Sequence, residues 1–232
     1  MGAGALGNLH CHSHYSDGRF SPLELVSYAA RAGLAHFGLT DHFETTKVPR
    51  ALRASQLDEY VGLLRDLDSK FSGSTKVHAG VEIDTSPDRT DLPNLPFDGL
   101  NRLDFILLEY VNDDEVGGSA LDDLEWLIEK IKVPCGLAHT DLSRVFDGVP
   151  PEALAERFES LNLFVEVNTN LFYTIDGVHL YERSKEFFDA FRGKVRVTVG
   201  SDTHRTLESM QDVRRGYEFV QRHGLSDMLL FK

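Results

Sequence analysis

Short apolar runs alternate with amphipathic segments along the chain, a pattern typical of α/β proteins. The runs predicted as strands end at residues 10–12 and lie at 37–42, 78–84, 104–110, 135–139, 163–168 and 195–202. The segments predicted as helices run from Ser21 to a stop at Gly33 and lie near 57–70, 119–131, 151–160, 179–191 and 207–222. Ser21 is placed as N-cap, with Pro22 at the first helical position. Seven strand–helix units predict a parallel sheet.

The two ends of the chain indicate how this sheet is arranged. The first strand ends at His10-x-His12 and the last at Asp202-x-His204. Residues i and i+2 of a strand point to the same side, so each pair can direct two ligands to one point. A doubly wound sheet usually separates its first and last strands, whereas a barrel brings all strand ends to one face. We therefore predict one α/β domain over residues 1–232, closed as a barrel, with the Pro- and Asp-rich loop 84–103 overhanging the site.

Composition narrows the class of protein. Lys and Arg total 24 and Asp and Glu total 37, a net charge of -13, which argues against long nucleic acids or membrane surfaces as partners. A phosphorylated substrate stays open, because bound cations can reverse the potential inside an acidic cleft. Two cysteines give no disulfide framework, and neither a signal peptide nor a membrane-length apolar run is visible. We expect a cytoplasmic protein and leave its oligomeric state open.

Metal-binding side chains are concentrated at the predicted strand ends. The candidates are His10, His12, Asp17, Asp41, His42, Glu82, His139, Asp202 and His204. Imidazoles and carboxylates without a Cys ligand suit Zn, Mn or Fe better than a structural thiolate zinc site. More than four ligands imply at least two ions, and Glu82 is well placed to bridge them. The competing interpretation is a set of polar strand ends bonded to loops, with Asp17 as a turn residue in Ser-Asp-Gly.

Six short motifs resemble, in order, those of the PHP (polymerase and histidinol phosphatase) superfamily. They are HCHSHYSDG (10–18), TDH (40–42), GVE (80–82), LAH (137–139), EVN (166–168) and GSDTH (200–204). The resemblance implies a distorted (β/α)7 TIM-like barrel with up to three metal ions. It places one ion on His10, His12, Glu82 and Asp202, a second on Glu82 and His139, and a third on Asp17, His42 and His204. Asp41 would then point away from the ions or orient a ligand, rather than bind metal.

One stretch departs from the family pattern. The family usually has another His just after the fourth strand, where this chain reads DFILLEYVND (104–113). Glu109 is the nearest replacement. It is either a ligand that alters the affinity of the second site or a supporting carboxylate, and the sequence leaves both open.

The resemblance implies a metal-dependent phosphoesterase. Two to three divalent ions (Zn, Mn or Fe) would activate a metal-bound hydroxide that attacks the phosphorus. We expect a small phosphorylated metabolite as substrate, as in histidinol phosphatases, with a nucleotide still open. No protein side chain is assigned as nucleophile or general acid. Arg144, Arg19 and Arg205 are candidates for contacting phosphate. His14 is a candidate for contacting the substrate, and Glu44 and Tyr173 for lining the pocket.

Two alternatives belong to other classes. An amidohydrolase-type C–N hydrolase also begins with His-x-His, but it would want a metal-bridging lysine and paired mid-chain histidines. This chain offers only His139 there, and Lys132 and Lys194 precede their strands. A non-catalytic, metal-dependent ligand-binding module is the second alternative, because a fold can outlast its chemistry.

Overall fold

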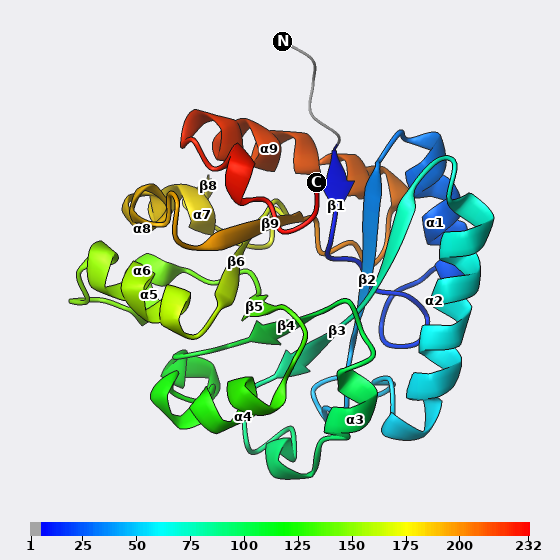
Figure 1. Ribbon diagram of the computed structural model, residues 1–232, viewed down its shortest axis with the longest axis horizontal. Coiled ribbons are helices and arrows are strands. Elements are labelled where there is room, and N and C mark those ends of the chain that lie inside the picture. The colour runs from blue at the N-terminus through cyan, green and yellow to red at the C-terminus, as the bar shows by residue number, and fades with distance from the viewer. Residues whose placement is uncertain (1–5) are drawn as a thin grey trace.

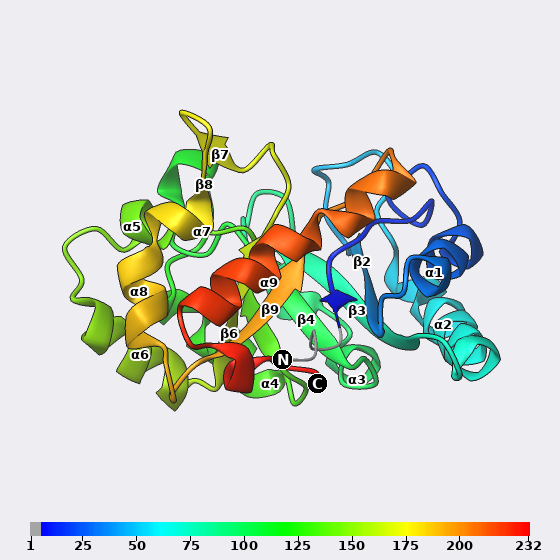
Figure 2. The ribbon, with the colours of Figure 1, turned by 90° about the horizontal axis from the view of Figure 1, so that it is seen from above.

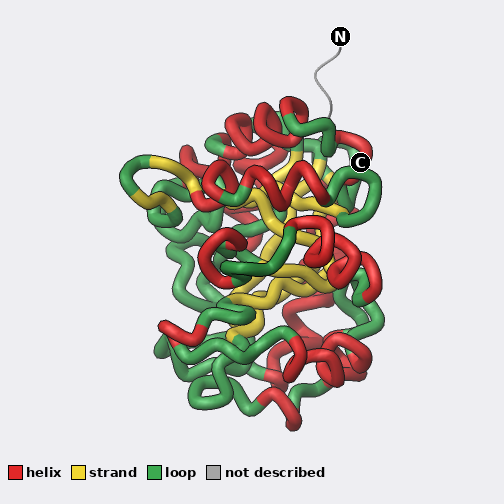
Figure 3. The backbone as a smooth tube through the Cα atoms, turned by 90° about the vertical axis from the view of Figure 1, so that its left-hand side faces the viewer, coloured by secondary structure: helices red, strands yellow, loops and turns green. Residues whose placement is uncertain are grey.

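The computed structural model describes residues 6–232 and contains a seven-stranded parallel sheet in the order β1-β2-β3-β4-β5-β6-β9. The first and last strands meet, since Leu9 N donates to Val199 O at 2.9 Å and His12 N to Thr203 O at 2.9 Å. The sheet is therefore a nearly closed barrel, with strands in the middle and helices around them (Figures 1 and 3). The predicted α/β barrel is confirmed.

The strands are β1 (Gly7–Asn8), β2 (His36–His42), β3 (Lys76–Asp84), β4 (Phe105–Glu109), β5 (Cys135–Leu137), β6 (Leu163–Asn168), β7 (Thr174–Ile175), β8 (Val178–His179) and β9 (Arg196–Gly200). The α-helices are α1 (Pro22–Arg31), α2 (Leu57–Phe71), α3 (Phe97–Leu100), α4 (Glu125–Lys130), α5 (Leu142–Val145), α6 (Pro151–Ser160), α7 (Leu180–Arg183), α8 (Lys185–Ala190) and α9 (Val213–Arg222). Short 3-10 turns are η1 (Ala54–Gln56), η2 (Leu92–Asn94), η3 (Asp114–Val116), η4 (Asp122–Leu124), η5 (Leu207–Gln211) and η6 (Ser226–Met228).

Helix α1 begins where the sequence predicts. Ser21 Oγ accepts from Glu24 N at 3.3 Å, and Ser21 N donates to Glu24 Oε2 at 2.8 Å. This capping box satisfies free N–H groups at the helix start.

Three predicted helices are each divided in the structure. The segment 119–131 forms η4 followed by α4, 179–191 forms α7 and α8, and 207–222 forms η5 followed by α9. The small β7–β8 hairpin precedes α7 and was not predicted. Its turn contains Asp176 and Gly177, both with positive φ. An Asp-Gly turn between two β-branched residues is the hairpin signal that the sequence offered.

The barrel interior is filled from both ends of the chain. Leu9, Phe105, Leu107, Ala138 and Phe164 form a buried cluster, against which Leu230 and Phe231 pack. Leu230 N donates to Val197 O at 3.0 Å, which extends the sheet by one bridge. The C-terminus lies at the opposite end of the barrel from the β7–β8 hairpin (Figure 2). This end of the barrel is thereby closed, and the strands' carboxyl ends remain for chemistry.

Within residues 6–232, no helix combines the length and the apolar character needed to cross a bilayer.

Candidate metal centre

The carboxyl ends of six strands and the loop before α1 bring the candidate ligands together. His10 and His12 follow β1, His42 ends β2, Glu82 lies in β3, Glu109 ends β4, His139 follows β5, Asp202 and His204 follow β9, and Asp17 lies in the loop before α1. All are buried except Asp17 and His204, which are partly exposed. Because β1 is only two residues long, His10 and His12 lie beyond it, on backbone that a bridge from Cys11 to Thr203 keeps aligned.

His10, His12 and Asp202 form one fully buried group. The Nε2 atoms of the two histidines lie 3.0 Å apart. Asp202 Oδ1 lies 3.0 Å from His12 Nε2 and 3.3 Å from His10 Nε2. The i, i+2 spacing thus directs both imidazoles to one point, as the sequence predicts.

Glu82 lies between the groups. Its Oε1 is 2.9 Å from His139 Nε2 and 3.5 Å from His10 Nε2, while its Oε2 is 3.0 Å from His42 Nδ1. Glu109 Oε1 lies 3.4 Å from His42 Nδ1. One carboxylate with its two oxygens turned to different partners has the geometry of a bridging ligand.

Asp17 and His204 complete the outer side of the cluster. Asp17 Oδ1 lies 3.1 Å from His204 Nε2 and 3.9 Å from His42 Nε2. His204 Nδ1 lies 3.0 Å from the carbonyl oxygen of Asp202. Donation by Nδ1 to that carbonyl would leave Nε2 unprotonated and able to bind a metal.

The electrostatics couple the imidazoles to the carboxylates. Burial alone would lower the pKa of His10, but Glu166, Glu82 and Asp202 outweigh it and raise that pKa well above 6.5. Burial would raise the pKa of Glu82, but His10 and His42 hold it well below its usual range. Burial, with the nearby His204 and His42, lowers the pKa of His12 to about 3. His10, with His12 and His204, likewise holds the pKa of Asp202 well below its usual range, so Glu82 and Asp202 offer negative charge to a cation.

Four buried polar atoms in this cluster make no hydrogen bond to any part of the described chain. They are His42 Nδ1, Glu82 Oε2, Glu109 Oε1 and Asp202 Oδ1. Glu82 Oε2 and Asp202 Oδ1 approach imidazole nitrogens at 3.0 Å, but without hydrogen-bond geometry. A buried polar group without a hydrogen bond is costly. His, Asp and Glu side chains also form four overlapping groups, and within each group three or four ligand atoms lie within 4.8 Å of one another. The donor set, nitrogen and oxygen without sulfur, fits Zn, Mn or Fe ions.

Glu166 and Asp41 support the ligands from behind. Glu166 Oε1 lies 2.8 Å from His10 Nδ1, and Glu166 Oε2 accepts from His139 N at 2.8 Å. Glu166 belongs to the EVN motif, but its spacing in the sequence did not predict this role. Asp41 accepts from Ser13 N at 2.8 Å and from the hydroxyls of Ser13 and Ser16 at 2.7 Å. It thus holds the loop of Asp17, in agreement with a supporting role.

The backbone is adapted to this crowding. His139 and Asp202 have φ of 32° and 46°, a region that non-glycine residues rarely adopt and that occurs at functional sites. A Cβ on Gly200 would lie 2.1 Å from Glu166 Oε1 and 2.4 Å from His10 Cβ. Only glycine lets Glu166 reach His10.

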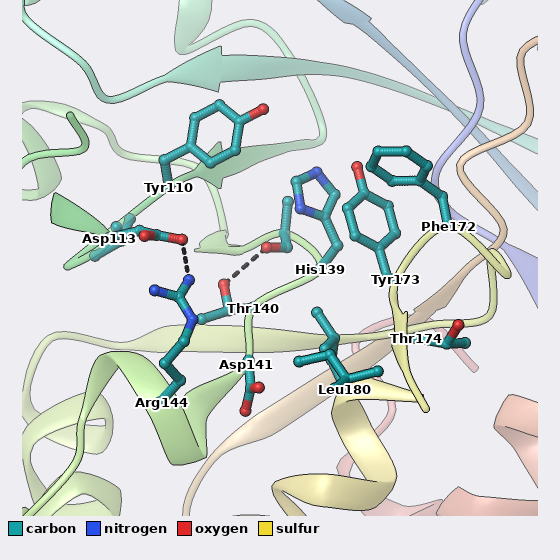
Figure 4. A pocket seen from close by; sticks show the side chains of 13 residues that line it. Tyr110, Asp113, His139, Thr140, Asp141, Arg144, Phe172, Tyr173, Thr174 and Leu180 are labelled. Atoms are coloured by element: carbon teal, nitrogen blue, oxygen red, sulfur yellow. Dashed lines mark hydrogen bonds and ion pairs between the residues drawn. The ribbon is translucent and has the colours of Figure 1, made fainter. Parts of the chain in front are cut away.

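Two adjoining cavities open over the cluster. The larger, about 740 Å³, is lined by Asp17, His42, Glu82, Asp202 and His204 together with Lys47, Tyr110, Tyr173 and Arg205. The smaller, about 240 Å³, shares Tyr110, Phe172 and Tyr173 and adds Asp113 and Asp141 (Figure 4). The Tyr173 ring is stacked on the His139 imidazole at 4.1 Å. The predicted lining role of Tyr173 therefore has a place in the structure.

Only some of the residues predicted to contact substrate line a cavity. Arg205 lines the larger cavity, and across residues 6–232 no carboxylate pairs with it. Arg144 lines the smaller cavity, but its guanidinium already binds Asp113 (Figure 4) and Glu115. Among the described residues, Arg19, His14 and Glu44 line neither cavity.

The loop 84–103 does not overhang the site, and that prediction is wrong. None of its described residues lines either cavity, because Asp84 accepts from Arg89 and Thr90 bridges to Thr45 at the side of the barrel. The larger cavity is bordered instead by the segments 170–173 and 205–212. Lys47, which the sequence analysis did not consider, also lines it.

Comparisons with known proteins agree with this geometry. A model of the PHP domain matches residues 8–224. The chain is 26% identical over 224 residues to a probable histidinol-phosphatase of Thermotoga maritima, covering 93% of this chain and 89% of the relative. It is 23% identical over 222 residues to the DNA polymerase/3'-5' exonuclease PolX of Bacillus subtilis, covering 90% of this chain but spanning only 36% of that relative.

A solved structure supports the fold independently. The histidinol phosphate phosphatase of Lactococcus lactis, complexed with zinc, L-histidinol and phosphate, superimposes with a TM-score of 0.68 at 17% identity. The match covers 95% of this chain and 94% of that chain.

Proposed function

The chain belongs to the PHP domain family, and we propose that it is a metal-dependent phosphoesterase that hydrolyses a small phosphorylated metabolite. The observation that carries the proposal is a set of four overlapping clusters of His, Asp and Glu ligand atoms. Two of the clusters share Glu82, which lines an open cavity. The names of two relatives, a probable histidinol-phosphatase and a probable phosphatase, support the same class of reaction.

Metal ions would be held by His10, His12 and Asp202, by Glu82 with His139, and by Asp17, His42 and His204, with Glu109 beside His42. Bound there, divalent cations supply Lewis-acid polarisation of a phosphate ester and lower the pKa of water. The protein's own task is to hold these donors at fixed positions before substrate arrives. Glu166 and Asp41 do this from behind, through hydrogen bonds of 2.7–2.8 Å.

The cavities also indicate how a substrate would be oriented. Arg205 offers an uncompensated guanidinium at the edge of the larger cavity, suited to phosphate oxygens. The smaller cavity, with aromatic walls and the carboxyls of Asp113 and Asp141, would receive the alcohol portion of the ester. Its volume of about 240 Å³ suits a small alcohol, not a polymer. The net charge of -13 also disfavours a long polyanion.

The test compares ester and amide chemistry on one preparation. Metal-loaded protein is assayed with p-nitrophenyl phosphate, bis-p-nitrophenyl phosphate, p-nitroacetanilide and histidinol phosphate, alongside a Glu82→Gln variant. We expect the phosphomonoesters to be hydrolysed, the anilide to be stable, and the variant to lose at least a hundredfold in kcat/KM. Turnover of the anilide would favour C–N hydrolysis. Full metal loading with no turnover of any ester would favour a ligand-binding module.

A further inference from the structure

We propose that Lys47 weakens the retention of one metal ion, the ion beside Glu109, by holding an ammonium charge against that carboxylate. The inference rests on the proposed metal centre and concerns how unequally its sites hold their ions. It assigns Lys47 a positioning role, acting through Glu109.

Lys47 and Glu109 form the one lysine–carboxylate ion pair that the described chain places in this cluster. Lys47 Nζ lies 2.6 Å from Glu109 Oε2, and the carboxylate is fully buried while the lysine side chain is 27% exposed. The other oxygen, Oε1, has no hydrogen bond within residues 6–232 and lies 3.4 Å from His42 Nδ1. Glu109 therefore turns one oxygen to a cation supplied by the protein and the other towards the proposed metal ligands.

The position of Lys47 is built into the loop after β2. Its backbone N–H donates to Thr45 Oγ1 at 3.0 Å, and the buried Thr45 bridges to Thr90. The ammonium also lies 4.8 Å from the centre of the Tyr110 ring, a favourable cation–π distance. Glu109 and the Tyr110 ring hold the lysine tail, and Thr45 holds its backbone, so the charge stays in place as that of a freely moving surface lysine would not.

The charges explain the effect on metal binding. Glu109 with Lys47 carries no net charge, so this side chain pair attracts a divalent ion far less than a lone buried carboxylate would. The ammonium also repels the incoming cation directly. Within residues 6–232, no lysine or arginine forms an ion pair with the group of His10, His12 and Asp202. We therefore expect that group to hold its ion tightly, and the ion bound through His42, beside Glu109, to exchange readily.

The experiment follows metal loss rather than turnover. Wild-type protein and the variants Lys47→Met, Lys47→Gln and Lys47→Arg are loaded with Mn²⁺ or Zn²⁺, freed of excess ion and mixed with a coloured chelator. Release is recorded against time, and total metal is determined by elemental analysis. Lys194→Met is the matched control, because Lys194 forms an exposed pair with Glu156 far from the centre.

We expect a fast-releasing ion in the wild type, in Lys47→Arg and in the control. In Lys47→Met and Lys47→Gln that ion should leave on the order of tenfold more slowly, as loss of one adjacent unit charge suggests. The effect should shrink when Glu109→Gln is added to Lys47→Met. Release rates equal to or faster than those of the wild type in both neutral variants would overturn the inference while leaving the phosphoesterase proposal intact. Absence of bound metal in every protein, wild type included, would instead refute the proposed metal centre, and this inference with it.

Discussion

Replacing Glu166 by Gln should impair metal binding without unfolding the protein. Glu166 contacts two candidate ligand residues at once, through His10 Nδ1 at 2.8 Å and His139 N at 2.8 Å, and it also accepts from Asn168 Nδ2 at 3.0 Å. A carboxylate accepts on both oxygens, whereas an amide accepts on one side and donates on the other. The Gln side chain must therefore lose the hydrogen bonds that one of the two Glu166 oxygens accepts.

The structure indicates which side changes. Turning the Gln amide nitrogen towards His139 and Asn168 would set it against two donors, while turning it towards His10 affects one ring nitrogen. The second orientation makes His10 Nδ1 an acceptor and moves the ring proton to Nε2, the atom that faces the cluster. A protonated Nε2 cannot bind metal. Loss of such supporting contacts typically costs 10–100-fold in affinity, which is about 1.4–2.7 kcal/mol.

The assay is metal affinity by competition with a chelator, combined with NMR of the His10 ring to identify its tautomer. Glu156→Gln, which alters an exposed carboxyl, is the control. We expect the Glu166 variant to keep its circular dichroism spectrum and to lose 10–100-fold in affinity. A folded variant with unchanged affinity and an unchanged His10 tautomer would refute this reasoning.

Three further predictions concern stability. Asp41→Ala leaves three donors from Ser13 and Ser16 without a partner and should cost about 3 kcal/mol in urea unfolding; a loss under 1 kcal/mol would contradict this. Burial, and then His36, lower the pKa of His78 to about 4 from 6.5, so the stability it contributes as a neutral group is present above pH 6.5 and is lost as the pH falls towards 4. The wild type should lose about 2 kcal/mol more than His78→Gln between pH 7.5 and 5, and parallel pH profiles would contradict this. Phe231→Ala removes the ring stacked on His78 at 3.9 Å and should cost about 2 kcal/mol with kcat/KM unchanged, since it lies at the far end of the barrel; a loss of activity at full stability would count against this.

The strand ends were the most predictable part of this protein. The i, i+2 spacing of His10 and His12 predicts that both side chains point to one site. Asp202 and His204 can join that site only if the first and last strands meet, as they do in a closed sheet. Those inferences depend on local geometry and on one topological argument, and both agree with the observed barrel.

The residues that support and border the cluster could not be found in the same way. Lys47 lies on an irregular loop, and its contact with Glu109 spans 62 positions of sequence. Glu166 was visible as a polar residue in an apolar strand, yet its partners depend on how three strands are placed side by side. The predicted position of loop 84–103 was wrong for the same reason. Nothing in the composition of this loop indicates on which side of the barrel it folds.

The most direct test of the central claim is the number of metal ions per chain, measured by elemental analysis while p-nitrophenyl phosphate turnover is followed during metal removal and return. The account predicts two to three ions per chain, loss of turnover on stripping, and recovery in step with reloading by Mn²⁺ or Zn²⁺. A folded protein that binds no ion after reconstitution, or one whose turnover is indifferent to metal, would contradict it.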